Sequence, residues 1–282
     1  MTLTIRIMTE ADFPTANQIL NKAFGTNDSR IDDLHRYLSL QPDGWFYGIL
    51  DGRPAATVGA IDFGPFAWIG FMAVDPELQN RGIGHEIMRN LLSWLDRRGC
   101  SMALLDATEA GRMIYLEHGF IDNSQSFQYT FEDYSKLSIP TRNVIPLNSQ
   151  DIPMLTKFDE PIYGANRERV FRLFLTDYPD RAFITKDDIG KITGFLFAQR
   201  QKIGPWAADN HQDAKKLLTA ALSLEYENNP RIIIPEENQA GIDLITQTGF
   251  TFQKSHTHMR RGGAAHPGNR SQIYGQASYG IG

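Results

Sequence analysis

The hydrophobic pattern is clearest from residue 68 onwards, where the period of a strand gives way to that of a helix. Trp68 to Val74 form an apolar run that predicts a buried strand. After a polar break, an amphipathic helix is predicted from about His85 to Arg98. Its apolar face is formed by Ile87, Met88, Leu91, Leu92 and Leu95. Gly99 follows, as expected where a helix ends on a left-handed residue.

A second strand and a second helix follow this pair. Ser101 to Leu105 predict a short buried strand. A further helix is expected from about Ala110 to His118, directly before Gly119 and Phe120. Two parallel strands joined by a helix almost always cross over right-handed, so the pattern predicts a right-handed strand–helix–strand unit.

The polar break carries the candidate chemistry, with the sequence Gln79-Asn80-Arg81-Gly82-Ile83-Gly84. The glycines at positions 82 and 84 remove Cβ atoms that would keep an anion away from the backbone. The first N–H groups of a helix lack intrahelical partners, so they can donate to a diphosphate. Arg81 adds a positive charge beside them. The segment therefore predicts a phosphate-binding site.

Three known phosphate-binding motifs can be compared with this segment. A P-loop needs Lys followed by Ser or Thr after its second glycine, whereas His85-Glu86 follow here. A dinucleotide-binding motif would place a third glycine or alanine where Ile87 stands, although Asp106 has the spacing of its acidic residue. What remains, Q-x-x-G-x-G between a strand and a helix, resembles the pyrophosphate-binding motif of the GNAT superfamily of acyl-CoA N-acyltransferases.

A second motif strengthens this resemblance. GNAT enzymes carry a tyrosine four residues before the glycine of a Gly-Phe pair, and Tyr115 stands at that position. The resemblance covers residues 68–120 and implies an α+β fold. In that fold a mixed, mostly antiparallel sheet contains one parallel strand pair and is flanked by helices.

The resemblance also implies the cofactor and the residues that bind it. Acetyl-CoA is the expected co-substrate, with no metal. The strand from Phe71 to Val74 is expected to splay from its neighbour, so that its backbone groups pair with the pantetheine arm and one N–H faces the thioester oxygen. The expected cofactor-binding residues are Met72, Ala73, Val74, Gln79, Asn80, Arg81, Gly82, Ile83, Gly84, His85 and Thr108.

Tyr115 is the candidate catalytic residue, as the general acid. A phenol with a pKa of about 10 is protonated at neutral pH and can donate to a departing thiolate. The general base stays open, because Asp106, Thr108 and Glu109 all follow the second strand. Asp106 is interpreted as the N-terminal cap of the next helix rather than as the base.

A faint internal repeat accounts for the length of the chain. Ile5 to Met8 lead into a helix start with Asp12 and Pro14, and Val144 to Leu147 lead into Asp151 and Pro153 in the same way. Leu104 to Phe120 are echoed by Ile232 to Phe250. Gly59 to Val74 are echoed by Gly194 to Ala208, and each stretch contains a predicted Gly-Pro-aromatic turn, at residues 64–66 and 204–206. Two copies of one domain are therefore predicted.

The predicted domains are 1–137, the GNAT acetyltransferase domain, and 138–282, a degenerate GNAT-like domain that shapes the acceptor site or the assembly. The join is expected near residues 132–141. The second copy has Asp209-Asn210-His211 where the first has its glycines, before a helix from about Gln212 to Glu227. Residues 260–272 are predicted to form a flexible loop before a last short strand, Ile273-Tyr274-Gly275. Trp206 is expected to pack against a neighbouring domain or an acceptor.

The composition of the chain limits the classes of partner and the cellular compartment that are expected. The 282 residues carry 28 basic and 33 acidic side chains, a net charge of −5, which argues against nucleic acid and anionic membranes. A single cysteine, Cys100, excludes an internal disulfide and is interpreted as a small buried residue. Residues 1–6 lack the apolar core of a signal peptide, and no apolar run is long enough to span a membrane. A cytoplasmic monomer or homodimer with a small-molecule or protein amine as acceptor is expected.

Other titratable residues have simpler interpretations. His256 and His258 alternate on a strand-like segment without a nearby third ligand, so a metal site is not predicted. Asp28, Asp32 and Asp33 are interpreted as a solvated helix start that could also border a cationic acceptor.

Three functions from different classes remain open. The leading interpretation is an acetyl-CoA-dependent N-acetyltransferase acting on a primary amine by direct attack on the thioester. The second is a non-catalytic coenzyme A-binding sensor or partner module. The third, a nucleotide-dependent oxidoreductase, lacks the third glycine of its motif.

Overall fold

A computed structural model describes residues 2–132, 144–263 and 265–282, and the described chain divides into two compact units. Of the described residues, unit 1 contains 2–122, 259–263 and 281, and unit 2 contains 123–132, 144–258, 265–280 and 282. The units therefore do not follow a single cut of the chain. The predicted boundary at 137/138 lies outside the described residues and stays a prediction.

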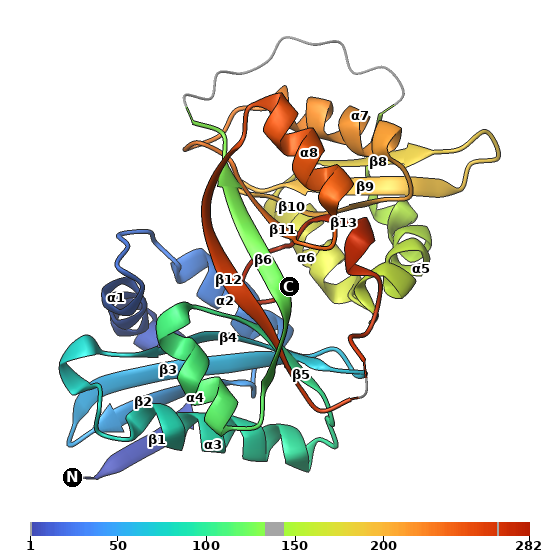
Figure 1. Ribbon diagram of the computed structural model, residues 1–282. Helices are drawn as coiled ribbons and strands as arrows, with labels where there is room; N and C mark the ends of the chain where they lie inside the picture. Colours follow the sequence, from blue (N-terminus) through green and yellow to red (C-terminus); the bar gives the residue numbers. More distant parts are fainter. Residues whose placement is uncertain (1, 133–143, 264) are drawn as a thin grey trace. The chain divides into compact units, whose positions relative to one another are not determined.

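Unit 1 alternates strands and helices around one sheet (Figure 1). Its elements are, in order, β1 (Leu3–Ile7), η1 (Glu10–Asp12), α1 (Phe13–Phe24), α2 (Ile31–Leu40), β2 (Trp45–Leu50), β3 (Arg53–Asp62), β4 (Ala67–Val74), η2 (Pro76–Leu78), α3 (Ile83–Arg97), β5 (Ala103–Ala107) and α4 (Glu109–Glu117). The strand order is β1-β2-β3-β4-β5, followed by β12 (Thr251–Arg261), of which residues 259–261 belong to unit 1. Neighbours are antiparallel from β1 to β4, whereas β4 and β5 are parallel. The predicted fold class is confirmed.

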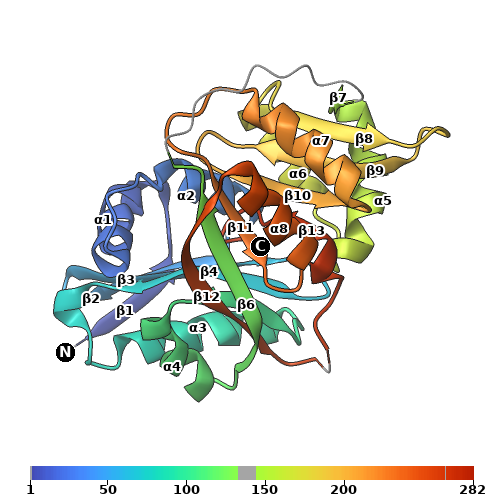
Figure 2. The ribbon, with the colours of Figure 1, turned by 45° about the horizontal axis from the view of Figure 1, so that its top comes forward.

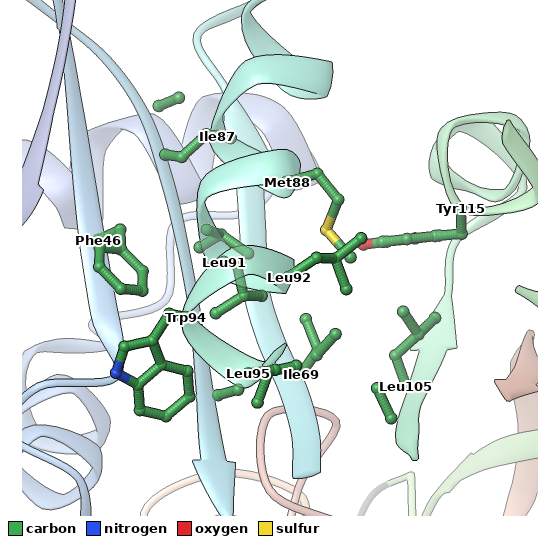
Figure 3. Close-up of a cluster of buried hydrophobic side chains, with 14 of the residues drawn as sticks. Phe46, Ile69, Ile87, Met88, Leu91, Leu92, Trp94, Leu95, Leu105 and Tyr115 are labelled. Carbon is green, nitrogen blue, oxygen red and sulfur yellow. The ribbon is translucent and has the colours of Figure 1, made fainter. Parts of the chain in front are cut away.

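Helices cover both faces of this sheet, with α1 and α2 on one face and α3 and α4 on the other (Figures 1 and 2). The residues of β3 from Ala55 to Ile61 are accordingly all buried, and this strand has no polar face. The apolar face of α3 packs on the sheet, where Ile87, Met88 and Leu91 are fully buried (Figure 3). The predicted periodicity of this helix is therefore confirmed, although the helix begins two residues earlier than expected, at Ile83.

From β7 to α8, unit 2 repeats the order of strands and α-helices that unit 1 has from β1 to α4. It contains most of β6 (Ile121–Thr130), then β7 (Ile145–Pro146), η3 (Ser149–Asp151), α5 (Ile152–Tyr163), α6 (Glu168–Asp177), β8 (Ala182–Lys186), β9 (Ile192–Ala198), β10 (Ile203–Ala208), α7 (His211–Leu222), β11 (Arg231–Pro235), α8 (Gln239–Thr248), most of β12, η4 (Arg270–Gln272) and β13 (Ile273–Gly275). Its strands form the order β13-β10-β9-β8-β7, and separately the order β12-β6-β11.

The repeat extends to the details of the helix starts. Asp12 closes a capping box with Thr9 before α1, and Asp151 closes one with Asn148 before α5. Both capping carboxylates directly precede a helix with proline in its first turn. The two predicted copies are thus the same supersecondary structure, built from the same local signals.

One expectation for the second copy is wrong, and the bounds of another need correction. The Gly-Pro-Trp sequence at 204–206 lies inside β10 rather than in a turn, and Trp206 is fully buried. Its ring packs against Tyr274 at a centroid distance of 5.0 Å and is part of the core of unit 2. The predicted loop at 260–272 is shorter than expected, because residues 260–261 belong to β12 and residues 270–272 form η4, where Arg270 is buried. The last short strand, Ile273–Gly275, is confirmed as β13.

Candidate functional site

The candidate site of unit 1 lies where β4 leads into α3. Asp75 directly follows the strand as the N-cap of the short helix η2, and its carboxylate accepts a hydrogen bond from Glu77 N at 3.0 Å. Lys22 Nζ donates to the same carboxylate at 3.2 Å. This bonded turn leads the chain into the segment from Gln79 to Gly82 and fixes the direction in which α3 starts.

The backbone of this segment turns through two left-handed residues, Asn80 with φ 60° and Gly82 with φ 77°. Gly82 is the N-cap of α3, and the first recorded helical bond runs from Glu86 N to Gly82 O at 3.1 Å. The N–H groups of Ile83, Gly84 and His85 precede this bond, so they have no acceptor within the helix. Together with the helix dipole, they form the kind of donor set that binds a phosphate oxygen.

The protein surroundings of the two glycines differ, while their predicted common role in phosphate binding stays a prediction. A Cβ at Gly82 would meet no protein atom within 4 Å, but the positive φ there disfavours any other residue. A Cβ at Gly84 would lie 2.9 Å from Ile114 Cδ1 and 3.4 Å from Met72 Cε. The absence of a Cβ at Gly84 therefore lets α3 pack closely against β4 and α4, whereas the space beside Gly82 is open.

Side chains around the helix start are held by local bonds. Gln79 Nε2 donates to Val74 O at 3.3 Å, and Arg81 Nη2 donates to the carbonyl of Glu77 at 3.4 Å. These contacts hold the side chains of Gln79 and Arg81, two of the predicted cofactor-binding residues, at the loop that precedes α3. Arg81 is exposed, so its guanidinium is accessible from solvent.

His85 meets a histidine that the sequence motif does not include. His85 Nδ1 lies 3.3 Å from His118 Nε2, and His85 Nε2 lies 3.6 Å from a carboxylate oxygen of Glu117. Burial lowers the pKa of His118, and the neighbouring His85 lowers it further. The pair joins the start of α3 to the end of α4.

Thr108 has a structural role at the start of α4. Its side-chain oxygen accepts a hydrogen bond from Gly111 N at 3.2 Å, which makes Thr108 the N-cap of the helix. The interpretation of Asp106 as this cap is therefore wrong, because Asp106 lies within β5. The assignment of Thr108 to the cofactor site stays a prediction.

The parallel pairing of β4 and β5 is short, as the predicted splay requires. The recorded register joins Ala67 to Ala103 and Trp68 to Leu104. The later residues of β4, including Met72, Ala73 and Val74, pair with β3 on the other side or lie at an irregularity. In the described part of the chain, no further parallel pair between β4 and β5 is recorded beyond Trp68.

That irregularity is a bulge centred on Phe71, which sequence reasoning missed. The register shifts between Thr57 and Gly59 of β3, and Phe71 opposite them adopts φ 53°. The fully buried Thr57 donates its hydroxyl to Phe71 O at 2.7 Å. The Phe71 ring packs on Tyr37 at a centroid distance of 5.2 Å. Phenylalanine is not among the residue types that favour a positive φ, so no signal in the sequence could have revealed the bulge.

Tyr115 projects from α4 toward Met88 and Leu92 of α3 (Figure 3). Its side chain is buried in the same apolar cluster as these two residues, with 8% of the residue exposed. Burial raises the pKa of the phenol, so the hydroxyl stays protonated well into the alkaline range. The phenol is thus expected to be protonated, as a proton donor must be, but it is buried among apolar side chains rather than in the polar site that a general acid would share with its substrate.

The remaining titratable residues considered in the sequence analysis are explained by their contacts within the fold. His256 and His258 are buried in β12, and the His258 ring lies 5.0 Å from that of His266. Among the described residues, no group of three His, Cys, Asp or Glu side chains could hold a metal ion. Cys100 is buried, and burial raises the pKa of its thiol. Asp32 and Asp33 lie in the first turn of α2, where Asp33 pairs with Arg36 at 3.1 Å.

Comparison with known proteins gives the same domain organisation. A model of the GNAT acetyltransferase family matches residues 11–120, and a model of the GNAT acetyltransferase domain matches residues 155–275. The chain is 24% identical over 220 residues to an uncharacterized N-acetyltransferase of Bacillus subtilis, YitH, covering 75% of this chain and 76% of that protein.

Solved structures have the same fold over nearly the whole chain. A putative acetyltransferase from Pyrococcus horikoshii superposes with a TM-score of 0.87 and 27% identity, covering 99% of this chain and 96% of the other. A GCN5-related N-acetyltransferase from Sphaerobacter thermophilus superposes with a TM-score of 0.71 and 14% identity, covering 96% and 98%.

These matches agree with the geometry of unit 1, in which the loop from Gln79 to Gly82 lies between β4 and α3. They establish that the chain belongs to the GNAT acetyltransferase family, in a tandem arrangement of two GNAT domains. Membership supports acyl transfer as the general activity. Among the described residues, no helix has both the length and the apolar character needed to cross a membrane.

Proposed function

We propose that the chain is an acetyl-CoA-dependent N-acetyltransferase that acetylates a primary amine by direct attack on the thioester. The observation that carries this proposal is the start of α3, where Gly82 opens the helix and the next three N–H groups precede the first helical bond. A diphosphate suits such a site because each oxygen accepts charge-assisted hydrogen bonds. Family membership supports coenzyme A as its carrier.

The neighbouring strand supplies the second part of the proposed site. The pantetheine arm would lie along β4 beyond Trp68, where the recorded pairing with β5 ends. The bulge at Phe71 turns the local backbone out of the regular ladder, so that an N–H of residues 72–74 can face the thioester oxygen. Fixed backbone donors of this kind stabilise the negative charge that develops on the oxygen during attack.

In the proposed reaction, the neutral amine nitrogen forms a bond to the thioester carbon, and the carbon–sulfur bond then breaks. The sulfur leaves as a thiolate that must take up a proton, and the nitrogen must lose one. Tyr115 is the proposed proton donor, because its phenol is protonated at neutral pH. The proton from nitrogen passes to water, and no residue is assigned as its base.

The surroundings of Tyr115 favour one alternative, a coenzyme A-binding module without catalysis. The phenol lies among Met88 and Leu92, a typical place for a structural tyrosine. Such a module would bind acetyl-CoA at the same helix start but release no thiol. Membership in the GNAT family leaves no structural support for the oxidoreductase alternative.

Release of free thiol from acetyl-CoA, measured with a panel of primary amines, separates these functions. The proposal expects thiol release that depends on at least one amine and on enzyme concentration. The Gly82→Val variant, which should bind acetyl-CoA at least about tenfold more weakly, is expected to release less thiol at subsaturating acetyl-CoA. Tight binding of acetyl-CoA without thiol release for any amine would favour the sensor. Thermal stabilisation by NAD but not by acetyl-CoA would contradict both.

A further inference from the structure

Unit 2 contains the same strand opening as unit 1, but a segment of the chain itself lies inside it. In unit 1 the parallel pairing of β4 and β5 begins at Ala67 and Ala103. The corresponding strands β10 and β11 of unit 2 begin with a parallel bridge between Lys202 and Arg231. Beyond this bridge, β10 pairs not with β11 but with β13, which comes from the end of the chain.

The segment bonds to both strands of the opening. On one side, β13 forms an antiparallel ladder with β10, in which Trp206 lies opposite Gly275. On the other side, Gln276 N donates to Ile233 O of β11 at 2.8 Å. Asn238, just after β11, donates to Ile273 O at 3.0 Å. A peptide backbone therefore satisfies the groups that, in unit 1, are proposed to pair with the pantetheine arm.

The ends of the segment coincide with the ends of the path proposed for the coenzyme. Near the start of α7, Gln272 Nε2 donates to Asp209 Oδ1 at 3.2 Å. Near the start of β10, Gln199 Nε2 donates to Ala277 O at 2.8 Å and to Gly204 O at 2.7 Å. The segment thus runs from the helix start back along the strand, which is the course from diphosphate to thioester in unit 1.

The helix start in unit 2 offers little to an anion. Asn210 caps α7, and its side chain accepts the hydrogen bond of Asp213 N at 2.9 Å. This bond satisfies one of the N–H groups that remain available at α3. The carboxylate of Asp209 precedes the cap and would repel a diphosphate.

A buried cation anchors the segment. Arg270 is 5% exposed, and its Nε donates to both carboxylate oxygens of Glu237 at 3.1 Å. Its Nη2 also lies 3.2 Å from Ser126 Oγ. A buried guanidinium that loses such partners strongly destabilises the folded state. These contacts therefore hold the segment in one place.

We propose that residues 273–277 are a built-in occupant of the coenzyme slot of unit 2, anchored by the preceding short helix η4, so that this slot binds an extended peptide, supplied by the chain itself, and not coenzyme A. The identification of the slot rests on the proposed function of unit 1, whereas the occupancy by peptide does not. Unit 2 then depends on this segment for its fold and contributes no second coenzyme site.

Hydrogen exchange on the full-length chain, followed by mass spectrometry with and without saturating acetyl-CoA, tests the proposal. Amides of residues 273–276 are expected to exchange at least about 100-fold more slowly than in an unstructured peptide. Acetyl-CoA is expected to leave their exchange unchanged while protecting residues 72–85. Acceleration of exchange at 273–276 by acetyl-CoA would show that the coenzyme displaces the segment, and would overturn the proposal.

A pair of arginine variants tests the anchor. Arg270→Gln removes the buried cation, whereas Arg172→Gln removes an exposed arginine that pairs with Glu168 on the surface of α6. Arg270→Gln is expected to accelerate exchange of residues 269–277 at least about tenfold, and Arg172→Gln is expected to leave it unchanged. Equal exchange in the two variants would overturn the anchoring role. Because these readouts need no coenzyme, they stay decisive even if unit 1 binds none.

Discussion

At the scale of single residues, Tyr115 is where the catalytic proposal and the observed packing disagree. The sequence motif assigns it a proton-donating role, yet its side chain lies in the apolar cluster between α3 and α4. Tyr115→Phe removes only the hydroxyl, so coenzyme affinity should change little. If the phenol protonates the thiolate, turnover should fall by about 100-fold, the usual scale for a general acid.

Steady-state kinetics and calorimetry on Tyr115→Phe decide between these roles. A variant that keeps more than half of the parent turnover would show that Tyr115 is structural. Because burial raises the pKa of the phenol, the parent should also show no loss of activity near pH 10 from deprotonation of this residue.

Thr57 is a second residue whose role can be separated from stability. Its hydroxyl holds the carbonyl of Phe71 at the bulge, next to the backbone groups proposed to face the thioester. Thr57→Val keeps the shape but removes the donor, so kcat should fall by about 10-fold to 100-fold through misplacement of the strand. The Kd for acetyl-CoA should change less than about threefold, since the helix start is untouched.

Two control variants accompany this measurement. Thr57→Ser restores the hydroxyl and should recover most of the kcat. Thr185→Val removes a buried threonine hydroxyl from β8 of unit 2 and should leave kcat unchanged. A similar loss of kcat in both valine variants would assign the effect to general destabilisation.

At the scale of elements, the repeated capping boxes give a pH-dependent prediction. The bidentate contact with Arg6, and bonds from Thr9, lower the pKa of Asp12 from 3.8 to about 2. A carboxylate that is held charged in the folded state contributes stability above pH 4, and this contribution disappears as the pH falls toward 2. At pH 7, Asp12→Asn should lower the free energy of unfolding by about 1–2 kcal/mol.

Urea unfolding between pH 2 and pH 7, followed by tryptophan fluorescence, measures this effect. The difference between parent and Asp12→Asn should be constant above about pH 5 and should shrink as Asp12 is protonated. An unchanged difference at pH 2 would assign the stabilisation to shape rather than to charge.

Most elements around the site were predictable because each carries a local signal. The apolar period of α3, the capping box before α1 and the Gly119 end of α4 all follow from short-range chemistry. Features set by tertiary contacts were not predictable. The bulge at Phe71 depends on Thr57 of another strand, and the burial of Trp206 depends on β13, which lies 67 residues further along the chain. Local patterns contain no information on such partners.

At the scale of the whole molecule, the two units share a fold but differ at the two places where unit 1 is proposed to bind coenzyme. Unit 1 starts α3 on Gly82, whereas unit 2 starts α7 on Asn210, which caps its own helix. Unit 1 leaves β4 without a recorded parallel partner beyond Trp68, whereas unit 2 pairs β10 with β13. The predicted role of the second domain in shaping the acceptor site stays a prediction.

The central claim, that the start of α3 is the coenzyme site of this chain, is tested most directly by calorimetric titration with acetyl-CoA. Gly82→Val and Gly99→Val form a matched pair, because both glycines have φ above 70°, lie at opposite ends of α3 and have open space where a Cβ would be. The strain introduced is therefore similar, while only Gly82 faces the proposed diphosphate.

The parent and Gly99→Val should each bind one acetyl-CoA per chain with similar Kd. Gly82→Val should bind at least about tenfold more weakly, since each lost hydrogen bond to a charged oxygen is worth about 1.5–3 kcal/mol. Two equivalent sites in the parent, or equal affinity of the two folded variants, would contradict this account.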